Sequence, residues 1–402
     1  MKKSTVSIVK VAPEAGYEAV SEGVRQAIAL AGGLEDVVKA GDLVLIKPNV
    51  LAPSAPGAGA CTDPRVCRAI ADLVRERGAR PVIAESSAVG VDTEKAYASV
   101  GYDALRDLGY EVVDLKKGKP VKLDVPGGYL ISEFGTWELV TQANVIISVP
   151  VLKTHDQAEM TLSLKNLKGL ESDKDKKALH KVGIFKGVTD LALALKPALT
   201  VIDGLIGQEG LGPLYGIPVP MGLLLASRDL VAADTVASLI ADFAPEELGI
   251  TVFAAQKGLG TMNLAEIEVT GEPVERVRRR FLRCSEDTRV QIEGLRIMHA
   301  PGTCTGCRNT VLSVVFDMKN ADQAQYLSGL TIVTGPGTEM PRDVPPESVI
   351  VVGICAPEEL RQGRFVTGCP PNNVAVVQEI LGGKVQAKRT YATEGAAQED
   401  QP

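Results

Sequence analysis

Short apolar segments alternate with helix-like segments over roughly the first 250 residues of the chain. The clearest strand-like segments are residues 43–46, 81–84, 145–149 and 199–202. Such alternation is typical of strands joined by helices that cover both faces of one sheet. The pattern therefore predicts an α/β fold with a doubly wound, mostly parallel sheet.

A helix is expected between the first two of these strands. Val66, Ile70 and Leu73 follow helical spacing, and Asp63 followed by Pro64 is a typical helix start. Further along, a basic segment over residues 274–280 is expected to form a charged helix at a domain boundary, with its arginines in solvent.

A smaller α/β unit is expected after this boundary, with strands at 331–333 and 349–352 and a last helix over 373–381. The chain of 402 residues is long enough for two or three units of about 150 residues. We expect an α/β domain over residues 1–284, a small four-cysteine domain over 285–388, and a disordered tail over 389–402 that lacks apolar residues.

Charge and cysteine content exclude several classes of protein. The net charge of −7 is unfavourable for binding nucleic acid, and no apolar stretch reaches the length of about 18 residues that a membrane span needs. The start of the chain has no apolar core of a signal peptide, and the odd number of cysteines, 7, disfavours a disulfide framework. We expect a cytoplasmic protein with reduced thiols.

Four of the cysteines fall in the second unit and form the strongest chemical signal. Cys304 and Cys307 make a C-x-x-C pair, and Cys355 and Cys369 follow in glycine-rich turns. Two thiolates on one turn can reach the same metal centre, and two more can complete a four-sulfur site. Cys369 is followed by proline, as in ferredoxin cluster motifs, so a [4Fe–4S] cluster is favoured and an anaerobic or microaerobic source is expected.

Other interpretations of these cysteines remain open. Zinc also accepts four thiolates, although its usual ribbon pairs two C-x-x-C motifs. Redox-active or simply buried thiols are a further alternative. Cys61, Cys67 and Cys284 are expected to be ordinary buried residues.

A second group of polar residues follows the predicted strands of the first unit. Lys153 and His155 come after the strand at 145–149, and Lys165 follows ten residues later. Ligands of open α/β sheets bind at the carboxyl ends of the strands. We expect these three residues to be catalytic, with Lys153 or His155 as the proton-transfer group.

Other strand ends are expected to contribute substrate-binding groups. Lysines and amides gathered at one sheet edge suit a small anion, a carboxylate or a phosphate. The expected substrate-binding residues are Lys47, Asn49, Glu85, Asn166, Lys168, Asp203 and Glu209. The remaining histidines, His180 and His299, are expected to have no role.

Together these stretches resemble the domain of unknown function 362 family, whose members are often described as uncharacterised iron–sulfur centre proteins. The matching residues are 45–49, 62–64, 149–155, 164–169, 201–204 with 207–212, and 228–234. Many members carry the ferredoxin-like run C-x-x-C-x-x-C-x-x-x-C-P, from which the four dispersed cysteines of this chain depart.

The first unit is also distantly similar to the amino-terminal domain of nickel-pincer lactate racemases. Lys153, His155 and Lys165 fall at places comparable to a Lys-x-His stretch and a lysine-rich glycine loop of that family. The other histidines of such an enzyme have no evident match, so nickel is not expected here.

Two functional hypotheses follow. In the first, the chain is an iron–sulfur enzyme, an oxidoreductase or a lyase or isomerase, that binds a small anionic substrate at the strand ends. In the second, it is a non-enzymatic iron–sulfur protein for electron transfer or cofactor assembly, with an electron-transfer protein as partner, or a structural-zinc protein.

Overall fold

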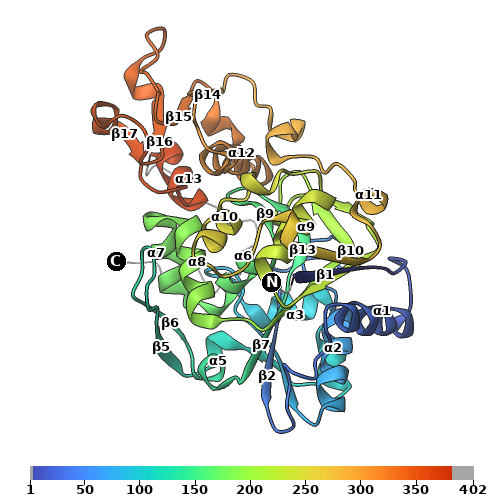
Figure 1. Ribbon diagram of the computed structural model, residues 1–402. Coiled ribbons are helices and arrows are strands. Elements are labelled where there is room, and N and C mark those ends of the chain that lie inside the picture. Colours follow the sequence, from blue (N-terminus) through green and yellow to red (C-terminus); the bar gives the residue numbers. More distant parts are fainter. Residues whose placement is uncertain (1–2, 383–402) are drawn as a thin grey trace.

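The computed structural model describes residues 3–382. It has a large α/β domain and a smaller one, drawn in orange and red at the upper left of Figure 1. The predicted tail, residues 389–402, lies outside the described residues, as does the end of the small domain beyond residue 382.

The large domain is built on an 11-stranded mixed sheet with the main order β13-β1-β12-β10-β7-β2-β3-β4. Strands β10, β7, β2, β3 and β4 run parallel, and β12 is antiparallel to both β1 and β10. The mostly parallel sheet predicted from the sequence is confirmed. The strands of the main path are β1 (Ser4–Lys10), β2 (Leu43–Pro48), β3 (Arg80–Glu85), β4 (Val112–Asp114), β7 (Val145–Val149), β10 (Leu199–Glu209), β12 (Leu223–Ser227) and β13 (Ile267–Gly271).

Three short strands branch from this path, and a separate hairpin lies beside it. β8 pairs with β10 and β9, and β11 pairs with β10. The bounds are β8 (Val151–His155), β9 (Glu159–Thr161), β11 (Ile217–Val219), and for the hairpin β5 (Pro120–Asp124) and β6 (Glu133–Trp137).

Both faces of the large sheet are covered, which explains why its strands are apolar throughout. Val44 and Ile46 of β2 pack on one side, against helices α1 and α2, while Leu45 packs on the other side, in the cluster of helix α8. Alternate side chains of a strand point to opposite faces, so a strand between two helical layers needs apolar residues at every position. The strands at 43–46, 81–84, 145–149 and 199–202 are all confirmed.

Helix α2 begins as its sequence predicts. Asp63 is the N-cap, its carboxylate accepts a hydrogen bond from the backbone nitrogen of Arg65 at 2.9 Å, and Pro64 is the first helical residue. The helices of the large domain are α1 (Tyr17–Leu30), α2 (Pro64–Glu76), α3 (Thr93–Val100), α4 (Asp103–Asp107), α5 (Glu138–Gln142), α6 (Ser163–Asn166), α7 (Asp173–Val182), α8 (Ile184–Leu195), α9 (Leu230–Ile240), α10 (Gly249–Gln256) and α11 (Val274–Val277).

The charged helix expected over 274–280 is shorter than its sequence pattern suggests. Helix α11 ends at Val277, and the arginines after it pair with acidic residues, Arg278 with Asp242 and Arg279 with Glu209. These ion pairs hold the segment that leads to the small domain against the large one.

The small domain has a four-stranded parallel sheet in the order β14-β15-β16-β17. Ile350 and Val352 face the cluster of helices α12 and α13, and Val349 and Val351 face a smaller cluster on the other side. The predicted strands and last helix are confirmed. The bounds are β14 (Arg296–His299), β15 (Thr331–Thr334), β16 (Val349–Val352), β17 (Arg364–Val366), α12 (Thr305–Asn320) and α13 (Asn373–Leu381).

Among residues 3–382, no helix is both long enough and apolar enough to cross a membrane.

Candidate functional site

A cavity of about 860 Å³ lies where the two domains meet. We call it the central cavity. Its large-domain wall contains every sequence-predicted catalytic or substrate-binding residue except Asp203 and Glu209, and its small-domain wall comes from helix α12, the end of β17 and the start of helix α13. The predicted residues in the wall are Lys47, Asn49, Glu85, Lys153, His155, Lys165, Asn166 and Lys168.

Strand β8 brings two of the predicted catalytic residues to the cavity. All of its residues are buried, and Lys153 and His155, two apart in sequence, both line the cavity. Thr154 between them instead donates a hydrogen bond to the carbonyl oxygen of Gly210 at 2.8 Å. The period of two along a strand thus places the lysine and the histidine on the same face.

Lys47 and Glu85 form a buried ion pair beneath the cavity. Nζ of Lys47 lies 2.7 Å from Oε2 of Glu85, and it also donates to Oδ1 of Asn166 at 3.0 Å. Burial lowers the pKa of Lys47, and Glu85 partly offsets this effect. Because its N–H donors are bonded to neighbouring residues, Lys47 stabilises the wall of the cavity and has no obvious free donor for a substrate.

Lys153 is fully buried and bonded to the main chain. Its Nζ donates to the carbonyl oxygens of Ala60 and Pro213. Burial lowers the pKa of Lys153 to about 8. The lysine therefore links two loops of the large domain at the edge of the cavity.

His155 is neutral at pH 7, because burial and the nearby charge of Lys165 lower its pKa to about 4. Its Nδ1 lies 2.9 Å from the backbone nitrogen of Gln157 and 2.9 Å from Oδ1 of Asp156. One nitrogen atom cannot accept from the first and donate to the second at the same time. The bond to the Gln157 N–H is the firmer of the two, because that donor is fixed, and it leaves the proton on Nε2.

Lys165 differs from the other lysines of the cavity. It lies on the short helix α6, and its Nζ makes no hydrogen bond or ion pair to any residue that the structure describes. Burial and the neighbouring charge of Lys168 lower its pKa to about 7. A substantial fraction of Lys165 is therefore a free amine at neutral pH.

Lys168 and Lys176 are held by acidic and main-chain groups. Lys168 lies 3.5 Å from Glu171, and Lys176 donates to the carbonyl oxygens of Ser86 and Ser87 at 2.9 Å. Burial lowers the pKa of both lysines, that of Lys176 to about 8. These residues keep positive charge beside the cavity.

His180 is a member of this site that the sequence analysis missed. It lines the cavity, its Nδ1 is buried without a hydrogen-bond partner, and burial together with Lys168, Lys165 and His155 lowers its pKa well below the usual value. It lies four residues after Lys176 on helix α7, and this spacing places both side chains on one helix face. This spacing was the one feature of the sequence that could have placed His180 beside the lysines of the site.

Asp203 and Glu209 lie outside the central cavity. Oδ2 of Asp203 accepts from the backbone nitrogen of Asp63 at 2.8 Å, so it secures the start of helix α2. Glu209 forms an ion pair with Arg279 at 2.9 Å. Both residues lie on β10, an 11-residue strand that extends past the ends of β7 and β2 before the chain turns. For this strand, a position at the predicted carboxyl end therefore did not indicate that a residue lines the cavity.

The small domain contributes carboxylate and amide groups. Asp317 of helix α12 has an Oδ1 atom without a partner among the described residues, and burial and the nearby Asp156 raise its pKa to about 7. Gln157 donates through Nε2 to the carbonyl oxygen of Pro371 and to Asn373, both at 3.1 Å. These bonds join the two domains beside His155.

The four cysteines of the small domain come together at one edge of its sheet. The strands are parallel, so their carboxyl ends share an edge, and the loops after β14, β16 and β17 carry Cys304, Cys355 and Cys369. The thiol of Cys307 lowers the pKa of Cys304, and burial together with Cys355 and Cys304 raises the pKa of Cys369, so the four thiols lie close enough to act on one another. The bond to Cys304, burial and the other three thiolates all raise the pKa of Cys307.

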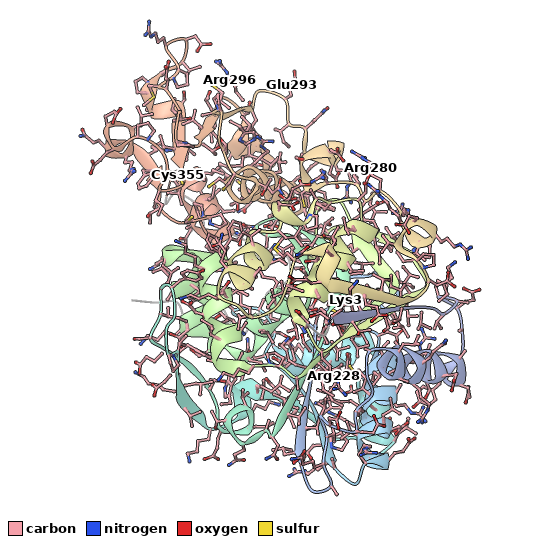
Figure 2. All side chains as sticks on the ribbon, in the orientation of Figure 1. Lys3, Arg228, Arg280, Glu293, Arg296 and Cys355 are labelled. Carbon is pink, nitrogen blue, oxygen red and sulfur yellow. The ribbon has the colours of Figure 1, made fainter. Side chains whose placement is uncertain are left out.

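Cys304 is the most acidic of these thiols for a clear reason. It is the N-cap of helix α12, and the thiol of Cys307 together with the backbone N–H groups of the first turn lowers its pKa to about 6. Cys304 and Cys355 are exposed, and Cys355 is labelled on the small domain in Figure 2. A carbon added at Gly353 would lie 2.8 Å from Sγ of Cys307, so only glycine leaves room for this sulfur.

Four thiols from three segments suit a thiolate-bound centre in their chemistry, and the nearby Lys186 partly offsets the rise that burial causes in the pKa of Cys369. Within residues 3–382, no group of three or more His, Cys, Asp and Glu side chains is placed so that it could hold a metal ion. A zinc ion would need all four sulfurs about 2.3 Å from one point. In a [4Fe–4S] cluster each thiolate binds a different iron, so the four sulfurs do not have to meet at a single ion.

The remaining cysteines lie apart from this edge. Cys67 is buried in the core of the large domain, Cys61 contacts the carbonyl oxygen of Ala52 at 3.6 Å, and Cys284 donates to the carbonyl oxygen of Gly210 at 2.8 Å. Burial raises the pKa of all three. Each is thus placed as an unreactive thiol.

Comparison with known proteins agrees with the family resemblance seen in the sequence of the large domain. The family model described as domain of unknown function (DUF362) matches residues 44–238. A thylakoid-associated protein, sll1697 of Synechocystis sp., is 33% identical over 273 residues, which cover 66% of this chain and 83% of that protein. The chain belongs to the DUF362 family. The matched residues include every predicted residue of the central cavity's large-domain wall and exclude the four cysteines.

Among solved structures, the lactate racemase apoprotein from Thermoanaerobacterium thermosaccharolyticum is similar to this chain with a TM-score of 0.39 and 12% sequence identity. The likeness covers 95% of this chain and 90% of that chain.

Proposed function

We propose that this DUF362 protein is an iron–sulfur enzyme that acts on a small anionic substrate in the central cavity. The observation that carries the proposal is the meeting of Cys304, Cys307, Cys355 and Cys369 on the edge of the small domain that contacts the cavity wall. These four cysteines would hold a [4Fe–4S] cluster. When bound, such a cluster supplies one-electron transfer or acts as a Lewis acid on a hydroxyl or carboxylate group.

The residues of the cavity would bind and orient the substrate. Lys165 and Lys168 supply positive charge for a carboxylate or phosphate, and the partnerless Nδ1 of His180 is free for a hydrogen bond. The Nε2–H of His155 would hold one of the substrate oxygens by a hydrogen bond. The small domain forms one wall of the cavity.

A non-enzymatic electron-transfer protein is the second candidate, and one observation favours it. Cys304 and Cys355 are exposed, so a cluster bound there would lie near the surface, where a partner protein could approach it. In this case Lys165 and His155 would not contact a substrate. Substitution of these two residues would then leave the physiological activity unchanged.

Anaerobic purification followed by iron, sulfide and zinc analysis and by visible and EPR spectra tests the metal centre. About four irons per chain with broad absorbance near 400 nm, which is on the order of a usual cubane spectrum, would support the cluster. One zinc in a colourless protein would replace it with a structural zinc site. Cys369→Ser should lower the iron content, and Cys61→Ser, the matched control in the large domain, should not.

A screen of small carboxylates and phosphate esters tests the cavity. We expect one class to bind to the wild type and to bind at least tenfold more weakly to a Lys165→Ala, His155→Ala double variant. If the wild type and the double variant bind every compound with equal affinity, the proposal that the protein is an enzyme is refuted. We also propose a cytoplasmic location, which fractionation of the source cells would test, since the Synechocystis relative is described as thylakoid-associated.

A further inference from the structure

We propose that Lys165 forms an imine with the carbonyl group of its substrate, so that the substrate is a small oxo acid: an aldehyde or ketone that also bears a carboxylate or phosphate. This inference rests on the anion-binding part of the proposed function and does not depend on the cluster.

The first support is the bonding of the buried lysines around the cavity. Lys47 is paired with Glu85, Lys153 is bonded to two carbonyl oxygens, Lys168 is paired with Glu171, and Lys176 is bonded to the loop after β3. Lys165 alone among these cavity lysines has no such partner in the described part of the chain. A lysine whose amine is bonded to other parts of the fold has no free amine in the cavity. A lysine that reacts with a substrate must have one.

The second support is the electrostatic setting of Lys165. Burial and the like charges of Lys168 and Lys153 lower its pKa to about 7, although Asp156 and Glu171 act in the opposite direction. At pH 7 the free-amine fraction of such a lysine is about 1,000 times that of a lysine with a pKa near 10.5. Burial beside another cation is a known way to turn a lysine into a nucleophile.

The third support is the surroundings of the amine, which indicate the rest of the substrate. Lys168 and His180 lie close enough to Lys165 for their charges to interact, and Nδ1 of His180 lacks a partner. When Lys165 is the free amine, Lys168 still supplies a cation for an acid group. A carbonyl compound with a negative group therefore satisfies both the amine and its neighbours.

The chemical step is balanced without any oxidant or reductant. Nζ of Lys165 attacks the carbonyl carbon, and a C–N bond forms as one amine proton passes to the carbonyl oxygen, which the Nε2–H of His155 can hold by a hydrogen bond. The second amine proton passes to the hydroxyl group of the resulting carbinolamine, whose C–O bond breaks as this oxygen leaves as water. The products are the imine and one water molecule. A protonated imine withdraws electrons from the adjacent carbon, which favours lyase or isomerase chemistry.

Reductive trapping tests the inference on the full chain as purified. The protein is incubated at pH 7 with cyanoborohydride and one of three probes: pyruvate, dihydroxyacetone phosphate or acetone. The modified residue is then located by peptide mass spectrometry. We expect an adduct on Lys165 with pyruvate or with dihydroxyacetone phosphate, which separates a carboxylate substrate from a phosphate. For pyruvate, the added mass is that of pyruvic acid less one oxygen atom. Acetone, which lacks an anionic group, should label Lys165 at least tenfold more slowly.

Two variants serve as controls. Lys165→Arg keeps the positive charge but cannot form an imine, because guanidinium stays protonated, and it should abolish the adduct. Lys174→Ala removes an exposed lysine from the same region of the fold and should leave labelling unchanged. The folding of both variants is checked by circular dichroism, and the mapping in the wild type does not depend on either of them.

Failure of this inference differs from failure of the proposed function. If acetate or sulfate binds by calorimetry but no probe labels Lys165, or if labelling spreads over exposed lysines, the imine is refuted and anion binding stands. If Lys165 is labelled in a protein that holds no iron after anaerobic purification, the imine stands and the cluster is refuted.

Discussion

The carbonyl oxygen of His180 accepts a hydrogen bond from the backbone nitrogen of Cys369 at 3.3 Å. The carbonyl oxygen of Cys369 in turn accepts one from the backbone nitrogen of Ile184 at 3.2 Å. The cysteine loop of the small domain is thus bonded to the chain between helices α7 and α8, which forms part of the central cavity's wall. A centre bound by Cys369 would therefore be mechanically linked to a residue that lines the cavity.

The buried ion pair beneath the cavity should contribute strongly to stability. Glu85→Ala leaves Nζ of Lys47 buried without its charged partner, and removing one member of such a pair costs about 3–5 kcal/mol in the free energy of unfolding. Urea denaturation measures the loss. The matched control is Glu111→Ala, which breaks an exposed pair with Arg80 and should cost about 1 kcal/mol or less. Equal losses for the two variants would contradict the assignment.

The thiol cluster should be sensitive to a single added carbon. Gly353 has a φ of 99°, and a Cβ at this position would lie 2.8 Å from Sγ of Cys307. We expect Gly353→Ala to displace this sulfur and to reduce the iron bound per chain by at least half. In Gly363→Ala, in the same domain, the added Cβ would meet no described atom within 4 Å, so this variant should bind as much iron as the wild type. Unchanged iron content in Gly353→Ala would place the metal elsewhere.

Anion binding should weaken as pH rises. The pKa of Lys165 is lowered to about 7 and those of Lys153 and Lys176 to about 8, so these lysines are charged below these values and lose their charge above them. Sulfate keeps its charge over this range. The affinity for sulfate should therefore fall between about pH 6 and 9. Each 1.4 kcal/mol of lost attraction lowers the affinity by on the order of tenfold. Calorimetry at a series of pH values measures this decline.

Lys165→Arg provides the control for this pH dependence. Arginine stays charged throughout the range, so the part of the decline centred near pH 7 should disappear while the part near pH 8 remains. A pH-independent affinity in the wild type would show that these lysines do not contact the anion.

Gln157 should control how firmly the small domain is attached near the cavity. Its Nε2 bonds to the carbonyl oxygen of Pro371 and to Asn373 would be lost in Gln157→Ala, and unsatisfied buried acceptors cost about 1–3 kcal/mol. Hydrogen exchange followed by mass spectrometry should show faster exchange over residues 369–376. Gln26→Ala, at an exposed position of helix α1, should leave this exchange unchanged.

Local patterns were sufficient for most elements of the fold. The Asp63–Pro64 start of helix α2 and the helix at 373–381 are correct because caps and apolar periodicity act over only a few residues. The helix expected over 274–280 is shorter: past Val277 the backbone nitrogen of Arg279 bonds to Ile240, and the arginines pair with Asp242 and Glu209 of distant segments. Such long-range ion pairs leave no trace in the local sequence.

The cavity was only partly predictable for the same reason. The rule that strand ends form sites correctly brought Lys47, His155 and Lys165 together, but it also included Asp203 and Glu209. It omitted His180, which lines the cavity from helix α7 and not from the end of a strand.

The sequence by itself determined the α/β class and the residue types available for chemistry, because apolar period, caps and cysteine spacing are local properties. Only the tertiary structure decided which of these residues meet. The parallel order of β14, β16 and β17 brings four distant cysteines to one edge, and the contact of Cys369 with His180 sets that edge against the cavity. Both depend on how strands pair and domains pack, which are sums of many weak contacts between residues far apart in the chain.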